Sequence, residues 1–397
     1  MRILDVGPWI AYPPEQGPAA RAFSLLKQLS VRHDVRQFGR GVPRLRRGER
    51  RLEEVPVTPM FRVYRYRAPL GRPAVEWWLG REPRGGVRDA IARRIACPPR
   101  LRELLEWANV ILVEDPLELA LCRREHPDGR YVFVAHGVGE LSSVSMTGHD
   151  RFPQALATGE LTIATSADDR RELVSRYGLP AERVVWVPGA VDVEGLAPVD
   201  PDTRARLRRE LALPDGPLVA FTGGATPASR AGLSWIRRLA EHDPRFTFLV
   251  AGGVGEPERR DNLVVVGKVP DVAPYLQAAD VAVCPIEYPH GTRHKLLEAL
   301  AAGLPCVAFP ESLHGTGLED GRHVLVAGKS EHELLEALDG LTTDPELAGR
   351  LAACGRAYVV DHHDARDAAA ILEEALLGLL AGRPEAPSGN GASHPSL

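Results

Sequence analysis

The stretch that decides the fold, residues 289–309, reads PHGTRHKLLEALAAGLPCVAF. It begins as a polar loop with two histidines, an arginine and a lysine, continues as the helical run HKLLEALAAG, and ends in PCVAF, which has the composition of a buried strand. A cationic loop that leads into a helix is suited to an anion, because backbone N–H groups and the helix dipole act together there. Glu298 lies among apolar residues of this helix, where a charge needs a polar partner or a ligand.

The same alternation of strand-like and helix-like segments extends in both directions from this stretch. Apolar runs such as VILV at 110–113 and YVFVA at 131–135 are separated by segments with helical periodicity. A first series ends in VVWVPGAVD, residues 184–192, and a second series follows it. Strands that alternate with helices predict parallel sheets covered on both faces. The predicted fold is therefore α/β, with two doubly wound Rossmann-like halves whose strand carboxyl ends face each other across a cleft.

The sequence pattern divides the chain into four parts. They are the halves at 1–192 and 193–365, a terminal helix at 366–381 that packs back toward the first half, and a disordered tail at 382–397. Near the start, Ala20, Phe23, Leu26 and Leu29 recur at helical spacing, which predicts a helix after the first strand. The segment from about 40 to 100 is rich in Arg and Pro without a clean period, so its fold stays unassigned.

Length and composition limit the class of protein. With 397 residues the chain exceeds one ordinary core, which agrees with two domains. Its 44% hydrophobic and 26% charged residues are typical of a soluble globular protein, and no apolar stretch reaches the roughly 18 residues of a membrane helix. The five cysteines are scattered without a CxxC pair and are expected to be reduced and structural. We therefore expect a cytoplasmic protein.

The charge is unevenly distributed along the chain. Residues 1–100 contain 21 Lys and Arg against 9 Asp and Glu, whereas the remainder contains 28 against 44. A basic segment could attract a phosphorylated substrate, an anionic membrane or nucleic acid. No RNA-binding aromatic pattern or zinc finger accompanies it, so no nucleic-acid partner is expected. Trp77 and Trp78 lie among arginines, which suits peripheral contact with the inner membrane face; the alternative is that they pack inside the first domain.

The anion that we expect at the loop before the helix is a diphosphate. Arg293 and Lys295 supply two cations. One cation about 4 Å from a phosphate oxygen is worth roughly 4 kcal/mol at an effective dielectric of 20, before desolvation is subtracted. Glu298 could then accept two hydrogen bonds from the vicinal hydroxyls of a ribose. The alternatives are a solvated basic first turn and a glutamate that faces solvent.

Together with its flanks, the segment CPIEYPHGTRHKLLEALAAGLPCVAF resembles the signature of the retaining family-four glycosyltransferases (group 1) of the GT-B fold. In that family a Glu, seven residues and a second Glu precede a run such as ALAAGLPVVA. PPEQGPAARAFSLLKQLSVRHDV resembles the family's glycine loop and first helix, VVWVPGAVD resembles its interdomain segment, and LVAGG, VVVGKV and YLQAADVAVCP keep its order and spacing. The resemblance covers nearly the whole chain, and the loop is most similar to a subgroup that reads GTRxKxLEA.

The resemblance implies roles for individual residues. Glu298 matches the second Glu, which binds the nucleotide ribose, whereas His290 replaces the first Glu, which contacts the donor sugar. Arg293 and Lys295 stand at the cationic, catalytic places of the subgroup. His136, at the end of YVFVAHG, matches the histidine beside the donor sugar; its alternative role is that of a structural residue at a strand end.

Further donor-binding positions are implied in both halves. Gly17 matches a glycine whose missing side chain lets a backbone amide approach the donor, although it could also be an ordinary turn glycine. In FTGGATPASRAG many relatives carry an Arg and a Lys for the diphosphate; here Arg230 is nearby, and the loop with Arg293 and Lys295 is expected to do that work instead. The remaining donor-binding positions are Gly223, Gly291, Thr292 and Leu297.

The function that the resemblance implies is transfer of a sugar from a nucleotide-diphosphate sugar to an acceptor hydroxyl with retention of anomeric configuration. Residues 1–192 would bind the acceptor and residues 193–365 the donor. The departing phosphate can take the proton, and no catalytic metal or other cofactor is expected. The acceptor is left open among a lipid-linked glycan, a cell-surface polysaccharide and a small specialised metabolite. The alternatives are a nucleotide-sugar epimerase of the same fold and a non-catalytic relative that binds sugar nucleotides.

Overall fold

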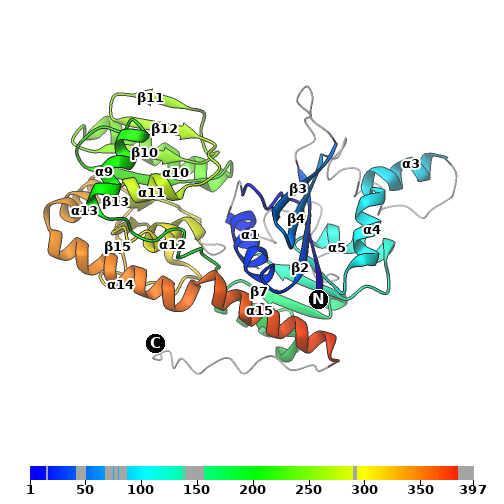
Figure 1. Ribbon diagram of the computed structural model, residues 1–397. Coiled ribbons are helices and arrows are strands. Elements are labelled where there is room, and N and C mark those ends of the chain that lie inside the picture. The colour runs from blue at the N-terminus through cyan, green and yellow to red at the C-terminus, as the bar shows by residue number, and fades with distance from the viewer. Residues whose placement is uncertain are drawn as a thin grey trace.

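The computed structural model describes residues 1–14, 17–41, 51–67, 75, 79, 87–136, 138, 156–288 and 293–382. These residues form two α/β halves that lie side by side, each built on a twisted sheet with helices against it (Figure 1). Both sheets are mostly parallel, which confirms the doubly wound α/β fold predicted from the alternation of strands and helices. No helix in these ranges combines the length and the apolarity needed to cross a bilayer.

The first sheet has the strand order β3-β4-β2-β1-β5-β6-β7-β8 within the described residues. Its strands are β1 (Arg2–Gly7), β2 (Asp34–Gly41), β3 (Leu52–Thr58), β4 (Phe61–Arg67), β5 (Val110–Val113), β6 (Tyr131–Ala135), β7 (Leu161–Ala164) and β8 (Val184–Trp186). Neighbouring strands are parallel except β3 and β4. The strands β5, β6 and β7 are buried along their whole length, because helices cover both faces of the sheet.

The helices described in the first half lie between its strands in the chain. They are α1 (Gly17–Leu29), α3 (Val87–Ala96), α4 (Pro99–Trp107), α5 (Pro116–Glu125), α8 (Ala167–Ser175) and the 3-10 turn η1 (Ala181–Arg183). α5 and α8 begin just after β5 and β7, where Asp115 and Ser166 accept hydrogen bonds from N–H groups of the first turn. α1 shares a core with Ile3 and Val35 of the sheet.

The second sheet has the order β11-β12-β10-β9-β13-β14-β15, and among its described strands β11 and β12 form the one antiparallel pair. Its strands are β9 (Leu218–Thr222), β10 (Thr247–Ala251), β11 (Glu258–Arg260), β12 (Leu263–Gly267), β13 (Val281–Cys284), β14 (Cys306–Ala308) and β15 (Leu325–Val326). Its helices are α9 (Pro201–Glu210), α10 (Pro227–His242), α11 (Ala273–Ala278), α12 (His294–Ala301), η2 (Pro310–Leu313), α13 (Glu331–Thr343) and α14 (Pro345–His363).

The chain passes between the two halves at two adjacent segments. It enters the second half after β8, and Val191 forms a β-bridge with Asp364 where the chain returns. α14 runs beneath the second half, and α15 (Ala365–Leu380) continues beneath the first (Figure 1). α15 packs against α1, where the Glu373 carboxylate accepts a hydrogen bond from His33 at 2.8 Å. The core on this face of the first sheet therefore contains a helix that follows the whole second half in sequence.

The structure contains strands that the sequence pattern did not reveal. β3 and β4 lie in the segment that was left unassigned, and β11 is a short strand at the edge of the second sheet. β2 reads DVRQFGRG, and its polar residues hide the strand alternation, although Val35 and Phe38 are fully buried. β3 and β11 are edge strands, where one face can remain polar, whereas β2 is an inner strand whose polar Gln37 and Arg40 are themselves buried.

The helix predicted from the spacing of Ala20, Phe23, Leu26 and Leu29 is α1. Leu26 and Leu29 are buried, and Ala20 and Phe23 are half-buried. Arg21 also lies on the buried face and is 3% exposed. Its burial requires compensation from neighbouring acids.

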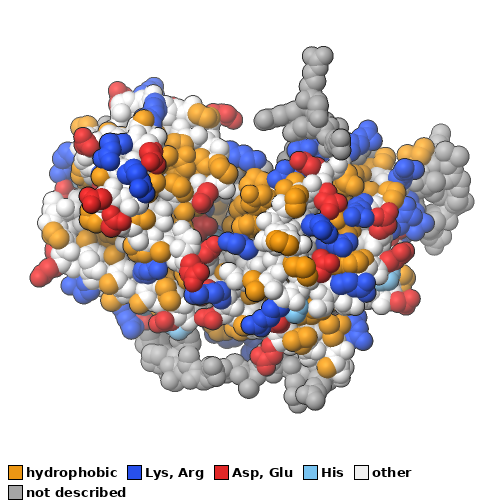
Figure 2. Space-filling view, viewed as in Figure 1, with side chains coloured by type: hydrophobic (Ala, Val, Ile, Leu, Met, Phe, Trp, Pro, Cys, Tyr) orange, Lys and Arg blue, Asp and Glu red, His pale blue; other side chains and the backbone are white. Residues whose placement is uncertain are grey.

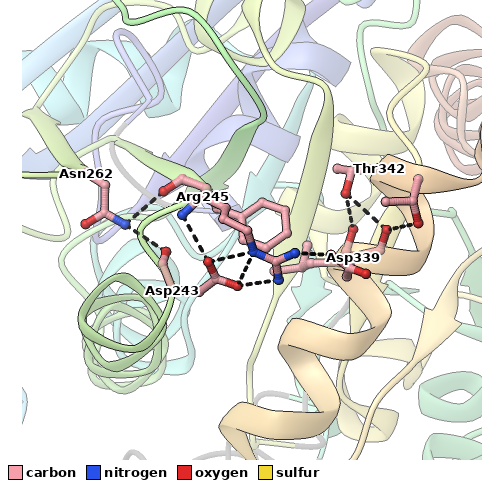
Figure 3. Close-up of polar contacts among 8 residues, drawn as sticks. Asp243, Arg245, Asn262, Asp339 and Thr342 are labelled. Atoms are coloured by element: carbon pink, nitrogen blue, oxygen red, sulfur yellow. Dashed lines mark hydrogen bonds and ion pairs between the residues drawn. The ribbon is translucent and has the colours of Figure 1, made fainter.

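A network of charges centred on the exposed Arg245 links three elements of the second half (Figure 3). Arg245, just before β10, donates hydrogen bonds to Asp243 at 2.7 Å and to Asp339 of α13 at 2.7 Å. Asn262 donates to the backbone oxygens of Asp243 and Phe246 at 3.0 and 2.8 Å. Together these bonds join the end of α10, the start of β10 and the outer face of α13.

Candidate functional site

The two halves meet at the first turns of α1 and α12. A Cβ atom placed on Gly17, the first residue of α1, would lie 3.7 Å from the Cβ atom of His294, the first residue of α12. The outline of the molecule is indented where the halves meet (Figure 2). α1 follows β1 and α12 follows β13, so this region lies at the carboxyl ends of strands from both sheets, where α/β proteins bind ligands. We treat it as the candidate active site.

On the side of the second half, Lys295 lies at the positive end of another helix. Its Nζ donates to the Ser229 Oγ at 3.1 Å, and Ser229 is in the first turn of α10. The Thr226 hydroxyl caps α10 by accepting a hydrogen bond from the Ser229 N–H at 3.2 Å. An anion at this point would be attracted by the ammonium group and by the dipole of α10 together.

Arg293 adds a second cation next to Lys295. It directly precedes α12 and is 8% exposed. Both cations are close enough to Cys284, the last residue of β13, to influence its thiol. Burial nevertheless raises the pKa of Cys284, and the two cations only partly oppose this effect. The thiol is therefore neutral, and Arg293 and Lys295 place positive charge near the end of β13.

Glu298 has a partner within its own helix. The His294 Nδ1 lies 3.4 Å from the Glu298 Oε1, one turn earlier on α12. The His294 side chain is 6% exposed and the Glu298 side chain 18% exposed. His294 Nε2 is buried and has no hydrogen-bond partner among the described residues. The expected need of the carboxylate for a polar partner is met by histidine, while part of the carboxylate still reaches the surface.

Two glycines allow close approach of backbones beneath α10. Gly252 has a φ of 107°, and a Cβ atom there would lie 2.4 Å from the Gly223 carbonyl oxygen. A Cβ atom on Gly223 would lie 3.1 Å from the Ser229 Cβ. The clash and the positive φ require a glycine at position 252, whereas a Cβ at position 223 would be tight against Ser229. At Gly17, in contrast, an added Cβ would lie at ordinary contact distance from the nearest described side chain, that of His294.

On the side of the first half, a carboxylate and an imidazole meet at the ends of neighbouring strands. Glu114 directly follows β5 and His136 directly follows β6. His136 Nε2 is hydrogen-bonded to the Glu114 Oε2. The Trp9 ring packs edge-on against the His136 ring, with centroids 5.1 Å apart and an interplanar angle of 82°. The imidazole is therefore fixed both by a charged partner and by an aromatic neighbour.

Behind this pair lie further buried charges. Burial, reinforced by the nearby Glu114 carboxyl, raises the pKa of Asp5 well above its usual range. Burial also raises the pKa of Glu114 to about 7, against the opposing effects of Asp5 and Arg21. Burial lowers the pKa of Arg21 to about 10, and the charges of Glu114 and Asp169 oppose this. Arg21 holds its position through a hydrogen bond from Nη2 to the Val187 carbonyl oxygen at 2.8 Å.

The structure brings some of the predicted site residues together. Gly17 meets the start of α12, which carries Lys295 and Glu298 and follows Arg293, and Leu297 is fully buried beneath that helix. Arg230 is exposed and donates from Nη1 to the Ala225 carbonyl oxygen at 3.1 Å, within its own loop. The positions that lie outside the described residues are His290, Gly291, Thr292, Trp77 and Trp78.

Reasoning from sequence missed several polar residues of this region. Asp5 is an acid inside the apolar strand RILDVG, and Glu114 directly follows the apolar run VILV. A single acid in or at the end of an apolar strand is the signal that could have identified both residues. Arg21 interrupts the apolar side of α1. The contact of Ser229 with Lys295 has no signal in the sequence, because it depends on how α10 and α12 are placed. Among the described residues, no group of three His, Cys, Asp or Glu side chains is placed to hold a metal ion.

Two family models match this chain. Residues 16–194 match the model described as Glycosyltransferase Family 4, and residues 216–344 match the model described as Glycosyl transferases group 1. A D-inositol 3-phosphate glycosyltransferase of Frankia alni is 30% identical over 304 residues, which cover 70% of this chain and 67% of that protein. A namesake from Xylanimonas cellulosilytica is 30% identical over 228 residues, covering 51% and 54%. The chain thus spans about two thirds and about half of the lengths of these relatives.

Solved structures share the fold at low sequence identity. The sucrose-phosphate synthase of Thermosynechococcus elongatus superposes with a TM-score of 0.69 at 18% identity, covering 96% of this chain and 100% of that chain. Anabaena Alr3699/HepE, solved in complex with UDP and glucose, superposes with a TM-score of 0.66 at 14% identity, covering 95% and 99%. At these identities the likeness establishes the arrangement of two facing Rossmann-like halves.

Proposed function

This chain belongs to the group 1, family 4 glycosyltransferases and has their GT-B fold, and from this premise we propose that it transfers a sugar from a nucleoside-diphosphate sugar to an acceptor hydroxyl with retention of anomeric configuration. The observation that carries the proposal is the position of Lys295. Lys295 belongs to α12, as does Glu298, and it lies two residues after Arg293 in sequence. Its ammonium group reaches the first turn of α10.

The chemistry of this arrangement suits a departing diphosphate. Negative charge develops on the leaving phosphate as the bond to the sugar breaks, and groups fixed in advance stabilise it without reorganisation. Lys295, Arg293 and the α10 terminus would supply that stabilisation. Glu298 would accept hydrogen bonds from the ribose hydroxyls, with His294 holding the carboxylate from one side. The acceptor hydroxyl would attack from the face that the phosphate leaves and pass its proton to that phosphate.

His136 and Gly17 would complete the site on the side of the first half. His136 would lie beside the donor sugar, and Gly17 would let a backbone amide approach it, since among the described residues an added Cβ there makes only an ordinary contact. Relatives named for inositol 3-phosphate, and a fold neighbour named for sucrose phosphate, add phosphorylated polyols and sugars to the acceptors that the sequence left open.

The nucleotide part of the proposal is tested by thermal stabilisation. UDP, GDP, ADP and dTDP are added to wild-type protein, to Glu298→Ala and to Glu336→Ala, which removes an exposed glutamate of α13 as a matched control. A nucleotide at 100 times its Kd adds about 2.7 kcal/mol to the stability of the protein that binds it. We expect one nucleotide to raise the Tm of the wild type and of Glu336→Ala. Glu298→Ala should bind it at least about tenfold more weakly, because hydrogen bonds to a carboxylate are lost.

Transfer is tested with the nucleotide sugar that carries the preferred base. Incubation with an acceptor panel that includes phosphorylated polyols should give a glycoside whose anomeric proton coupling matches that of the donor. Release of a new sugar nucleotide without acceptor would instead identify an epimerase. Nucleotide binding without turnover on any acceptor would identify a non-catalytic relative. A folded wild-type protein that none of the nucleotides stabilises would contradict the proposed donor site.

A further inference from the structure

Polar side chains line one face of the first sheet at the carboxyl ends of three strands. Side chains alternate across a strand, so Asp5 lies on the same face as Ile3, Glu114 on the same face as Leu112, and His136 on the same face as Val134. Ile3, Leu112 and Val134 all belong to the core that α1 and α15 cover. In register, Asp5 is paired with Leu112 on β5. Asp5, Glu114 and His136 therefore form a row beneath the first turns of α1, at the floor of the candidate site.

The Asp5 carboxyl has an unusual environment. It is fully buried, and neither oxygen has an ordinary hydrogen-bond donor among the described residues. The group that faces it is the Glu114 carboxyl. Gln37, its register partner on β2, lies close enough to oppose the rise in the Asp5 pKa, and its side chain also donates to the Trp9 carbonyl oxygen at 3.0 Å. Two buried carboxylates cannot lie together unless one of them carries a proton, which then forms the hydrogen bond between them.

We propose that Glu114 is a positioning residue for His136: it shares one proton with Asp5 on its inner side and accepts the His136 Nε2–H on its outer side. The inference rests on the proposed function, in which His136 lies beside the donor sugar. It adds two residues to the site, neither of which the resemblance to the family assigned.

The arrangement sets both the tautomer and the rotation of the imidazole. With Nε2 donating to Glu114, a neutral His136 carries its proton on Nε2, and the edge of Trp9 limits rotation of the ring. The charges facing the pair are Arg21 of α1 and His136, and Asp169 of α8 lies within reach of Arg21. One proton on the pair leaves one negative charge, which Arg21 balances. A buried hydrogen-bonded chain of this kind keeps an imidazole within the narrow geometry that a reacting site needs.

The direct test is the state of the His136 ring, which can be measured without any substrate. Protein labelled with 15N-histidine is examined by long-range 1H–15N correlation, and His136→Gln assigns the resonance. We expect the Nε2–H tautomer in the wild type. Glu114→Leu removes the acceptor and should give the mixed tautomer of an unrestrained histidine. Asp5→Asn replaces the shared proton with an amide donor and should keep the Nε2–H signal.

Kinetics then separate a role in the reaction from a role in folding. We expect Glu114→Leu to lower kcat about a hundredfold while the donor KM changes less than about threefold, because misplacement of a site residue acts mainly on the reacting geometry. Glu114→Gln keeps the shape but cannot ionise, and it should alter the pH profile of kcat even where Glu114→Leu folds poorly. Glu118→Gln is the matched control: it breaks the buried pair of Glu118 with Arg40, whose Nε lies 2.6 Å from the carboxylate.

Several outcomes would overturn the inference. An Nδ1–H tautomer in the wild type, or loss of the Nε2–H signal in Asp5→Asn, would contradict the proposed chain of hydrogen bonds. Unchanged kcat and pH profile in Glu114→Gln would contradict the role in positioning, and so would an equal change in Glu118→Gln. Failure of the proposed function has a different signature: the wild type would bind no nucleotide, while the His136 resonance would still report on Glu114.

Discussion

The charges beneath α1 and the charges around Arg245 are two networks of opposite design. In the second half, Arg245 is 64% exposed in its side chain, and its Nε, Nη1 and Nη2 all donate to carboxylates of Asp243 or Asp339. On the buried face of α1, the Arg21 Nε has no hydrogen-bond partner among the described residues. The same holds for both Asp5 oxygens, and the neighbouring Glu114 carboxyl raises the Asp5 pKa further. The exposed network satisfies every charged nitrogen of its arginine, and the buried one does not.

The difference indicates which network serves function. An exposed ion-pair network costs little to form and contributes modestly to stability. A buried group of charges pays a desolvation cost that its members recover only with good geometry. Proteins tolerate that cost mainly at functional sites, where shifted pKa values are useful. The buried network lies on the floor of the candidate site, which agrees with this rule.

The comparison would be sharpened most by removing the buried cation. Arg21→Met keeps an unbranched apolar side chain on the buried face of α1 but leaves the negative charge of the Asp5–Glu114 pair without Arg21. We expect the free energy of unfolding to fall by about 3 kcal/mol or more, because an uncompensated buried charge remains. Urea unfolding at pH 8, where the carboxyls ionise most, measures this loss. A variant as stable as the wild type at that pH would show that Arg21 does not balance the pair.

A smaller effect is expected from pH. The folded-state pKa of Glu114 is raised to about 7 from an ordinary 4.5, and that of Asp5 is also raised. Raised carboxyl pKa values mean that the folded state holds protons that the unfolded state releases, so this contribution to stability is complete below about pH 4.5 and is lost as the pH rises through about 7. Relative to Asp5→Asn/Glu114→Gln, the wild type should be more stable at pH 5 than at pH 8 by at least about 1.4 kcal/mol.

The stability of the wild type must be compared with that of Asp5→Asn/Glu114→Gln at each pH, because another titrating group affects stability in the opposite direction. Burial lowers the pKa of His363 to about 4. The contribution of His363 to the free energy of unfolding is therefore lost as the pH falls from about 6.5 toward 4. His363 is present in both proteins, and its effect cancels in the difference. Urea unfolding in parallel at pH 5, 6, 7 and 8 gives the required curve. A difference that is flat across this range would contradict the raised pKa values.

The smallest effect is expected in the exposed network. Arg245→Ala should change the Tm by about 2 °C or less, since exposed ion pairs contribute little and salt screens them. Differential scanning calorimetry at 0.05 and 0.5 M NaCl should show the change shrinking as salt rises. Nucleotide stabilisation should match that of the wild type. A large loss of nucleotide binding in Arg245→Ala would break the comparison, because it would give the exposed network a role in the site.

The sequence predicted the fold class from strands that are apolar throughout, such as those ending at Val113 and Ala135. It missed β2 because Arg36, Gln37 and Arg40 conceal its alternation. It singled out Glu298 because a charge stands out on a short apolar helix, and Lys295 because it adds a cation to the loop that leads into this helix. The pairing of Lys295 with Ser229 and of Glu114 with Asp5 joins segments far apart in the chain. Such pairings follow from strand register and helix placement, which single-sequence periodicity does not encode.

The position of α15 has a consequence for how the protein is made. Ala368, Leu372 and Leu376 of this helix belong to the same core as Ile3 and Leu26. During synthesis the first half leaves the ribosome early, yet the helix that covers its apolar face is translated only after the whole second half. The nascent chain must therefore hold an uncovered apolar face until translation has passed Leu380. Separate expression of the first half alone would reproduce that state permanently, and a chaperone that shields exposed apolar surface would act on this intermediate.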